Sequence, residues 1–118
     1  MNRERRFSPR HRAYLPVHLQ PRDTLKTVDT LTKDISRGGL RCLSPAPFPV
    51  ASEVRVELVL SAGQAPLTVI GNTKWFRTLP YSDMFEVGMS FVELPEETER
   101  RLSTYLDRLS GQPVPATV

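Results

Sequence analysis

Two short polar stretches near the start of the chain carry the side chains best suited to binding a ligand: "RRFSPR" at residues 5–10 and "KDISRGG" at residues 33–39. The first places Arg6 and Arg10 four residues apart, and the second contains Asp34. A guanidinium group is a planar, permanently charged fork of N–H donors, whereas a carboxylate only accepts hydrogen bonds. The question is whether the arginine stretch is a loose basic tail or half of a binding site.

Each stretch also has a simpler interpretation. A basic N-terminal segment is usually solvated charge. In the second stretch, Asp34 and Ser36 are of the types that bond local backbone in a turn, where Gly38 or Gly39 would supply a positive φ. The turn explains the glycines well, but it does not explain an aspartate at the end of a strand beside an arginine-rich segment.

The basic charge is confined to that segment. The chain has a net charge of +3, of which residues 1–12 contribute +4, so the other 106 residues sum to −1. The first 12 residues contain one acid, Glu4, and five arginines, Arg3, Arg5, Arg6, Arg10 and Arg12. A protein that binds a long polyanion usually spreads its basic residues over a face of the fold. The distribution therefore argues against DNA as a partner.

The residue inventory argues against an enzyme. The two histidines are His11, within the arginine cluster, and His18, at a strand position expected to face solvent. There is no glycine-rich phosphate loop with a lysine and no serine in a nucleophile elbow. Cys42 alternates with Leu40 in an apolar strand pattern, which indicates a small buried hydrophobic residue. We predict no catalytic residue, no metal site and no cofactor.

Length and composition predict one soluble domain. At 118 residues the chain can bury a core without disulfides or metals. Its single cysteine fits a reducing, cytoplasmic compartment. No secretory signal follows the basic N-terminus, and no apolar run approaches the roughly 20 residues that a transmembrane segment needs.

Most of the chain has the period of two that is typical of half-buried strands. In "VRVELVL", for example, four apolar side chains alternate with polar ones. Gly71 interrupts a further β-rich stretch, where it would mark a bulge or a close backbone approach. The predicted strands cover residues 13–20, 25–35, 39–43, 54–60, 67–75 and 85–91, with turn-type segments between them.

A helical period appears only in "PEETERRLSTYLDRLS", residues 95–110. Its apolar positions follow i, i+3, i+4 and i+7, Pro95 suits the first helical position, and Gly111 suits the C-terminal cap. The apolar side chains of this stripe are Leu102, Tyr105, Leu106 and Leu109. We expect the helix to pack on one end or flank of the sheet.

About six antiparallel strands leave exposed edges unless the sheet closes, so we predict a mainly β fold, a six-stranded antiparallel β-barrel with one C-terminal α-helix. The expected organisation is a flexible, arginine-rich, ligand-binding arm at 1–12, the barrel at 13–94, the helix at 95–110 and a disordered tail at 111–118.

At this point the sequence resembles a known family. Arg6-x-x-x-Arg10 followed by Asp34-x-Ser36-x-x-Gly39 is similar to the two-part signature of PilZ domains, bacterial receptors for cyclic di-GMP. The resemblance covers nearly the whole chain, since "RRFSPRHRAYLPVHL", "GNTKWF" and "FEVGMSFVEL" look like the family's opening arm with its first strand, a later strand and its last strand. The family fold is a six-stranded barrel with a C-terminal helix, which agrees with the strand count.

The chemistry of cyclic di-GMP suits such a pair of motifs. A guanidinium can fork the O6 and N7 acceptors on the Hoogsteen edge of guanine, and a second one can meet a phosphate or stack on a purine. The N1 and N2 donors of guanine suit a carboxylate such as Asp34. Because adenine has a donor in place of O6, this combination selects guanine.

The resemblance assigns ligand contacts to the motif residues, and three other residues are weaker candidates. Arg5 would stack on a second ligand molecule if the site holds an intercalated dimer, so one or two ligands per chain remain open. Trp75 and Arg77 are further candidates to line the site, although tryptophan is more often a core residue. The residues expected to contact cyclic di-GMP are Arg5, Arg6, Arg10, Asp34, Ser36, Gly38 and Gly39.

These expectations describe a stand-alone cyclic di-GMP receptor whose ligand clamps the mobile arm onto the barrel. Its signal would pass to an unidentified protein effector that reads the altered surface. Two alternatives are a PilZ-like adaptor that binds no ligand and a small barrel that binds single-stranded nucleic acid, although the latter usually sets aromatics along a basic face. The sequence does not indicate whether motility, exopolysaccharide synthesis or chemotaxis is controlled.

Overall fold

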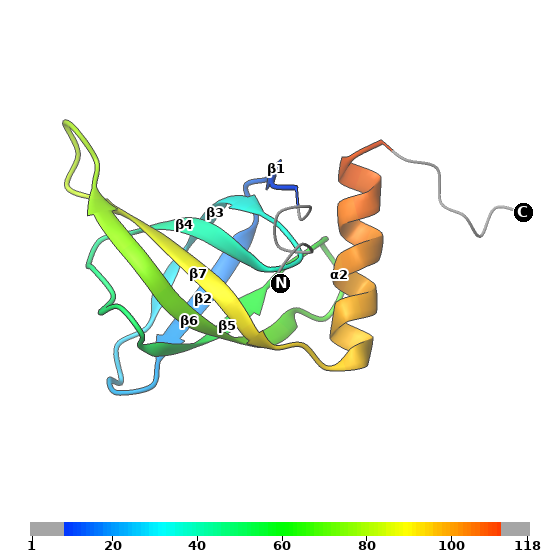
Figure 1. Ribbon diagram of the computed structural model, residues 1–118, viewed down its shortest axis with the longest axis horizontal. Coiled ribbons are helices and arrows are strands. Elements are labelled where there is room, and N and C mark those ends of the chain that lie inside the picture. The colour runs from blue at the N-terminus through cyan, green and yellow to red at the C-terminus, as the bar shows by residue number, and fades with distance from the viewer. Residues whose placement is uncertain (1–8, 112–118) are drawn as a thin grey trace, which may run out of the picture.

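A computed structural model describes residues 9–111 of the chain as seven strands and a helix (Figure 1). The predicted flexible arm and disordered tail fall mostly on residues 1–8 and 112–118, outside the described residues. The elements are β1 (His11–Arg12), β2 (Pro16–Pro21), β3 (Val28–Ile35), β4 (Gly39–Ser44), β5 (Glu53–Leu58), β6 (Leu67–Thr78), β7 (Phe85–Glu93) and α2 (Glu96–Leu109).

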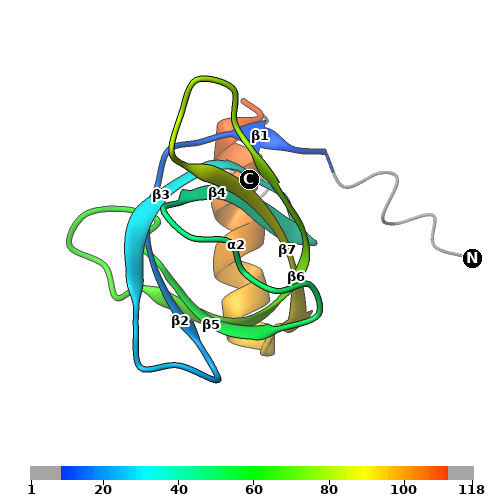
Figure 2. The same cartoon turned by 90° about the vertical axis from the view of Figure 1, so that its left-hand side faces the viewer.

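Six of the strands close into an antiparallel barrel, as the sequence predicts. Neighbouring strands follow the order β3-β2-β5-β6-β7-β4, and β4 pairs back with β3. Figure 2 looks along the barrel and shows this ring. Closure pairs the edges that an open sheet of the same strands would expose. It also brings β3 beside β4 and places β4 next to β7, which sets the geometry of the site described below.

Alternation of side chains decides which face of each strand is buried. In β5, Val54, Val56 and Leu58 are buried in the barrel, whereas Arg55 is exposed on the outer surface. The core also takes a residue from the proline-rich segment after β4, Phe48, which is buried although its surroundings read as a turn. The predicted bulge near Gly71 is present as a shift of register between β6 and β7.

Helix α2 covers one end of the barrel, behind the ring in Figure 2. Leu102 and Leu106 are its buried side chains, and they extend the barrel core. The helix begins one residue later than predicted, because Pro95 is its N-cap and not its first helical residue. Gly111 follows the helix with φ of 77°, a conformation that glycine adopts without strain.

Strand β1 lies within the segment predicted to be a flexible arm. His11 pairs with Ile35 and Arg12 with Asp34 at the end of β3 that β2 leaves unpaired. The backbone of β3 there has free hydrogen-bonding groups, and β1 satisfies them. Residues 11–12, predicted to belong to the arm, therefore pair with the barrel sheet, and Arg10 immediately precedes this strand.

The glycines of the β3–β4 turn are required for a different reason than the sequence suggested. Positive φ among the described glycines occurs at Gly63 and Gly111, so the prediction that Gly38 or Gly39 supplies one is wrong. Gly39 instead pairs with β7, where an added β-carbon would lie 2.0 Å from the carbonyl oxygen of Met89. Barrel closure between β4 and β7 therefore excludes a side chain at this position.

We expect Gly39→Ala to lower the free energy of unfolding by about 1–3 kcal/mol, because the backbone of β7 must move to admit the methyl group. Gly38→Ala is the matched control, since the nearest atom to its added β-carbon is the Ser36 hydroxyl oxygen at 4.0 Å. Urea unfolding of both variants gives the comparison. Equal unfolding midpoints for the two would contradict this account of Gly39.

Candidate ligand-binding site

A β-bulge in β3 turns Asp34 to the outer surface of the barrel. Thr32 pairs with Cys42, but the next pair is Asp34 with Arg41, so Lys33 is an extra residue on β3. Without it, strict alternation would place Asp34 on the same inward face as Thr32. With it, Lys33 and Asp34 both belong to the outer face, beside Arg41 of β4.

A second bulge does the same in β6. Thr73 pairs with Met89 and Trp75 with Gly88, which leaves Lys74 as the extra residue. Lys74 and Trp75 therefore lie on the outer face in succession. The indole of Trp75 lies directly over Gly88, because a β-carbon at that glycine would be 2.3–2.6 Å from three ring atoms. Gly88 thus provides the surface against which the tryptophan packs.

Asp34 is held by two arginines. Arg10 Nη1 donates to its Oδ1 at 3.0 Å, and Arg41 donates to its Oδ2 through Nε at 2.6 Å and through Nη2. Asp34 is only 5% exposed, so its charge needs these partners. The hydrogen bond to Asp34 raises the pKa of Arg41, against the opposing effect of its partial burial. Arg10 and Asp34, 24 residues apart in sequence, meet directly.

Glu86 on β7 continues this ion cluster. Its side chain is 0% exposed, although strand alternation opposite Val87 places it on the outer face. It is buried there because three cationic side chains cover the outer face at this point. Arg77 donates to Oε1 through Nε at 2.6 Å and Nη2 lies at the same distance, while Lys33 Nζ lies 3.1 Å and Arg41 Nη1 3.7 Å from Oε2.

The charge balance at Glu86 favours its ionised form. Burial by itself would raise the pKa of this carboxyl, but the adjacent Lys33 and Arg77 cations lower it below its ordinary value. Arg41 is the link between the two carboxylates, since it hydrogen-bonds Asp34 and faces Glu86. Asp34 is therefore oriented by a chain of charges that reaches from β1 to β7.

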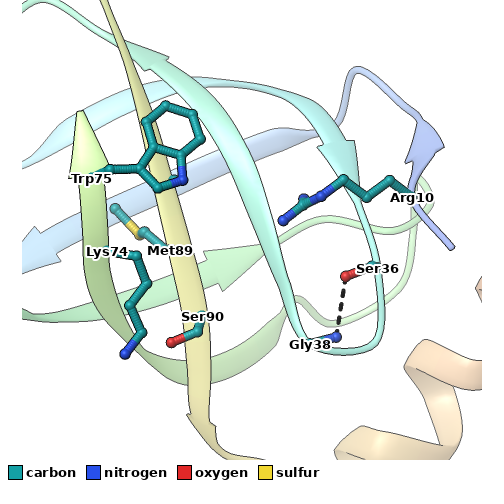
Figure 3. Close-up of a pocket in the computed structure, with 8 residues that line it drawn as sticks. Arg10, Ser36, Gly38, Lys74, Trp75, Met89 and Ser90 are labelled. Carbon is teal, nitrogen blue, oxygen red and sulfur yellow. Dashed lines mark hydrogen bonds between the residues drawn. The ribbon is translucent and has the colours of Figure 1, made fainter. Parts of the chain in front are cut away.

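Beside the cluster lies an open pocket of about 350 Å³. Figure 3 shows Arg10 reaching over it from the β1 side, the turn of Ser36 and Gly38 at its border, and Lys74 on the side away from Arg10. The lining residues are Arg10, Ser36, Gly38, Lys74, Trp75, Gly88, Met89 and Ser90.

The turn that borders the pocket is built by Ser36. Its backbone N–H donates to the carbonyl of Gly39 at 2.8 Å, and its hydroxyl accepts from the N–H of Gly38 at 3.2 Å. The carbonyl of Gly38 accepts from the N–H of Phe91 on β7 at 2.8 Å. Ser36 is buried, so it serves the turn whether or not it also meets a ligand.

The residues predicted from sequence are thus partly gathered in one place. Arg10, Ser36 and Gly38 line the pocket. Asp34 does not line it but accepts a hydrogen bond from Arg10, and Gly39 faces Met89 on β7. Trp75 lines the pocket. Arg77 does not line it, and its guanidinium carbon lies 6.0 Å from the Trp75 ring centroid. The positions predicted at Arg5 and Arg6 lie outside the described residues.

Three residues near the site were not predicted from the sequence: Arg41, Lys74 and Ser90. A signal existed for Arg41, since it alternates with the apolar Leu40 and Cys42 and so had to face outward. No comparable signal existed for Lys74, because its position depends on a bulge.

The other reactive groups of the described part of the chain have structural surroundings. Cys42 is fully buried, and burial first, then the charge of Glu86, raises its pKa to about 12. This agrees with the prediction of a small buried hydrophobic residue. Between residues 9 and 111, no three His, Cys, Asp or Glu side chains are grouped to hold a metal ion. In the same range, no helix is long and apolar enough to cross a membrane.

Comparison with known families assigns the fold. Residues 4–108 match the PilZ domain model, and the chain belongs to the PilZ family, a family of ligand-binding domains that includes cyclic di-GMP receptors. No curated protein sequence matches the chain significantly.

Solved structures share the architecture at low sequence identity. The Bacillus subtilis inhibitor of motility MotI/DgrA has a TM-score of 0.75 and 18% identity over 92% of this chain and 53% of its own. The PilZ domain of Escherichia coli YcgR with c-di-GMP has a TM-score of 0.69 and 17% identity, and the match covers 91% of this chain and 92% of that domain. The K. pneumonia MrkH–c-di-GMP complex has a TM-score of 0.70 and 16% identity, and the match covers 88% of this chain and 52% of MrkH. The chain therefore spans about half the length of MotI and MrkH.

We expect Glu86→Gln to lower the free energy of unfolding by about 1–3 kcal/mol at neutral pH, because the cations around it lose their counter-charge. The folded-state pKa of Glu86 lies below its ordinary value of 4.5. Its stabilisation is therefore present above pH 4.5 and disappears as the pH falls through the folded-state pKa.

Urea unfolding across this pH range measures the effect. The difference between parent and Glu86→Gln should narrow as the pH is lowered, whereas Glu93→Gln, at an exposed position of the same strand, should change little at any pH. A Glu86→Gln difference that stays constant down to about pH 3 would contradict the lowered pKa.

Proposed function

We propose that this PilZ domain is a receptor that binds cyclic di-GMP in the pocket between Arg10 and Trp75. The observation that carries the proposal is the contact of Arg10 with Asp34, which joins the two halves of the family signature at the border of a pocket. The likeness of the fold to YcgR and MrkH, both described in complex with c-di-GMP, supports it.

The hydrogen-bond capacity of Asp34 suggests how the ligand enters. A carboxylate has about four lone-pair sites. Arg41 uses two of them on Oδ2 and Arg10 uses one on Oδ1, so about one remains. A guanine that donates both N1–H and N2–H to Asp34 needs two. We infer that Arg10, whose side chain is 46% exposed, leaves Asp34 for the ligand when guanine binds.

Two other groups suit the rest of the ligand. Lys74 is exposed and forms no ion pair with the acidic side chains of residues 9–111, so its charge is available to a phosphate. Trp75 presents part of its ring in the same pocket, where a purine can stack on it. Arg41 stays on Asp34 and keeps that carboxylate oriented.

The arm completes the proposal. Because β1 pairs residues 11–12 with β3, a closing movement of the arm would involve residues 1–10. Arg6 would contact the ligand with Arg10, and Arg5 would stack on a second ligand molecule if two bind. Closure of the arm would change the outer surface of the barrel, and a protein effector would read that change.

Calorimetric titration with cyclic di-GMP tests the proposal. We expect micromolar or tighter binding by the parent, and Arg6→Ala, Arg10→Ala and Asp34→Ala each to weaken it by about tenfold or more, the usual effect of losing a charge-assisted hydrogen bond. Arg22→Ala is the matched control, because Arg22 is an exposed arginine paired with Glu53 outside the pocket.

Titrations with GTP and a short single-stranded oligonucleotide distinguish the alternatives, and a duplex DNA tests the expectation that no DNA binds. The DNA titration is included because the fold is similar to that of MrkH, which is described as a transcription regulatory factor. No heat with cyclic di-GMP in the parent would leave the adaptor interpretation. A stoichiometry of one ligand per chain would remove the role of Arg5.

Lys74→Gln tests the phosphate contact separately. We expect about two- to tenfold weaker binding of cyclic di-GMP and a shallower dependence of the affinity on salt, because one charge pair with the ligand is lost. Lys26→Gln, an exposed lysine in the β2–β3 loop, is the control and should leave both quantities unchanged. An unchanged salt dependence in Lys74→Gln would place the phosphates elsewhere.

A further inference from the structure

A second pocket, of about 440 Å³, lies between helix α2 and the loop that joins β5 to β6. Arg100, Arg101 and Arg108 line it from the helix, and Ser61 and Gln64 line it from the loop. No carboxylate is among its lining residues. None of these residues lines the pocket beside Asp34.

The arginines are held in different ways. Arg101 Nη2 donates to the carbonyl oxygen of Ala65 at 2.6 Å, which ties the helix to the loop and fixes the guanidinium at the pocket wall. A guanidinium has five N–H donors, so this contact leaves most of them available. Arg100 is paired with Glu97, whereas Arg108 forms no ion pair with any acidic side chain of residues 9–111.

We propose that this basic cleft, defined by Ser61, Gln64, Arg101 and Arg108, binds a short acidic segment of the partner protein. Forked guanidinium donors recognise carboxylates in two-point contacts, and the hydroxyl and amide of the loop add neutral hydrogen bonds. The inference rests on the proposed function, since it supplies the chemistry of the effector that a receptor of this kind requires.

Charge on the same helix limits the length of that segment. The first turn of α2 carries Glu96, Glu97 and Glu99, whereas Arg108 is the basic residue of the last turn, beside Asp107. Glu97 and Arg108 are about 16 Å apart along the axis at 1.5 Å per residue. A long polyanion such as DNA or an anionic membrane surface would extend over these glutamates and be repelled. A short acidic segment can contact Arg101 and Arg108 without extending over these glutamates.

The basic cleft also lies next to an element of the first site. Arg37 Nη2, in the turn that follows β3, is 4.0 Å from Asp107 Oδ1, the residue before Arg108. Figure 1 shows this turn extending toward α2. A partner bound at the basic cleft would therefore be close to the turn that borders the proposed cyclic di-GMP pocket.

The test uses the full ¹⁵N-labelled chain and an acetylated, amidated tetraglutamate peptide, followed by amide chemical shifts. We expect shift changes confined to residues 61–65 and 100–108. Arg108→Gln, at an exposed position, should weaken the binding about threefold or more, and the Arg101→Gln/Arg108→Gln double variant should abolish it. Arg22→Gln is the matched control and should bind as the parent does.

Three results would overturn the inference: no shift changes at the basic cleft with tetraglutamate, equal changes with sodium phosphate at matched ionic strength, or stronger binding of duplex DNA or phosphatidylserine vesicles through the same arginines. Cyclic di-GMP is titrated into a second portion of the same sample. Its shifts at residues 36–39 report on the proposed receptor function alone, so either hypothesis can fail while the other stands.

Discussion

The carboxylate of Asp34 is the point on which the site depends. It lies on an almost fully buried position of a barrel strand, where an unpaired charge would be costly, and two guanidinium groups compensate it from β4 and from the residue before β1. Because Arg41 also faces Glu86, charged side chains from β3, β4, β6 and β7 form one connected ion cluster. A change at either carboxylate therefore alters the orientation of the arginines at both.

The two bulges explain how a closed barrel can carry such a cluster on its outside. A regular strand presents every second residue to solvent, which separates neighbouring functional groups by two positions. The extra residues Lys33 and Lys74 each place two successive side chains on the outer face. On the outer face of β3, Asp34 therefore follows Lys33 directly, and on β6 Trp75 follows Lys74 directly. Bulges near functional sites commonly redirect side chains in this way.

The sequence predicted the barrel and the helix, because alternation and the helical period depend on local spacing; it named Arg10 and Asp34 as ligand contacts but did not predict that they bond each other. It did not predict the burial of Glu86 or the position of Lys74. Alternation tells which face a residue occupies, but it does not tell whether long cationic side chains cover that face or where a bulge shifts the period. Gly39 was expected to permit a positive φ, but its constraint comes from Met89, 50 residues away.

The same contact that stabilises Asp34 also limits it as a receptor group. Asp34 has too few free lone pairs for Arg10, Arg41 and a guanine that donates twice, so under the proposed function ligand binding would exchange one partner for another. That exchange costs little, because Arg41 still compensates the carboxylate and the phosphates of the ligand replace the negative charge that Arg10 gives up. A second, fixed arginine thus makes the first one free to move. An aspartate held by Arg10 alone would bind the arm more firmly and the ligand less well.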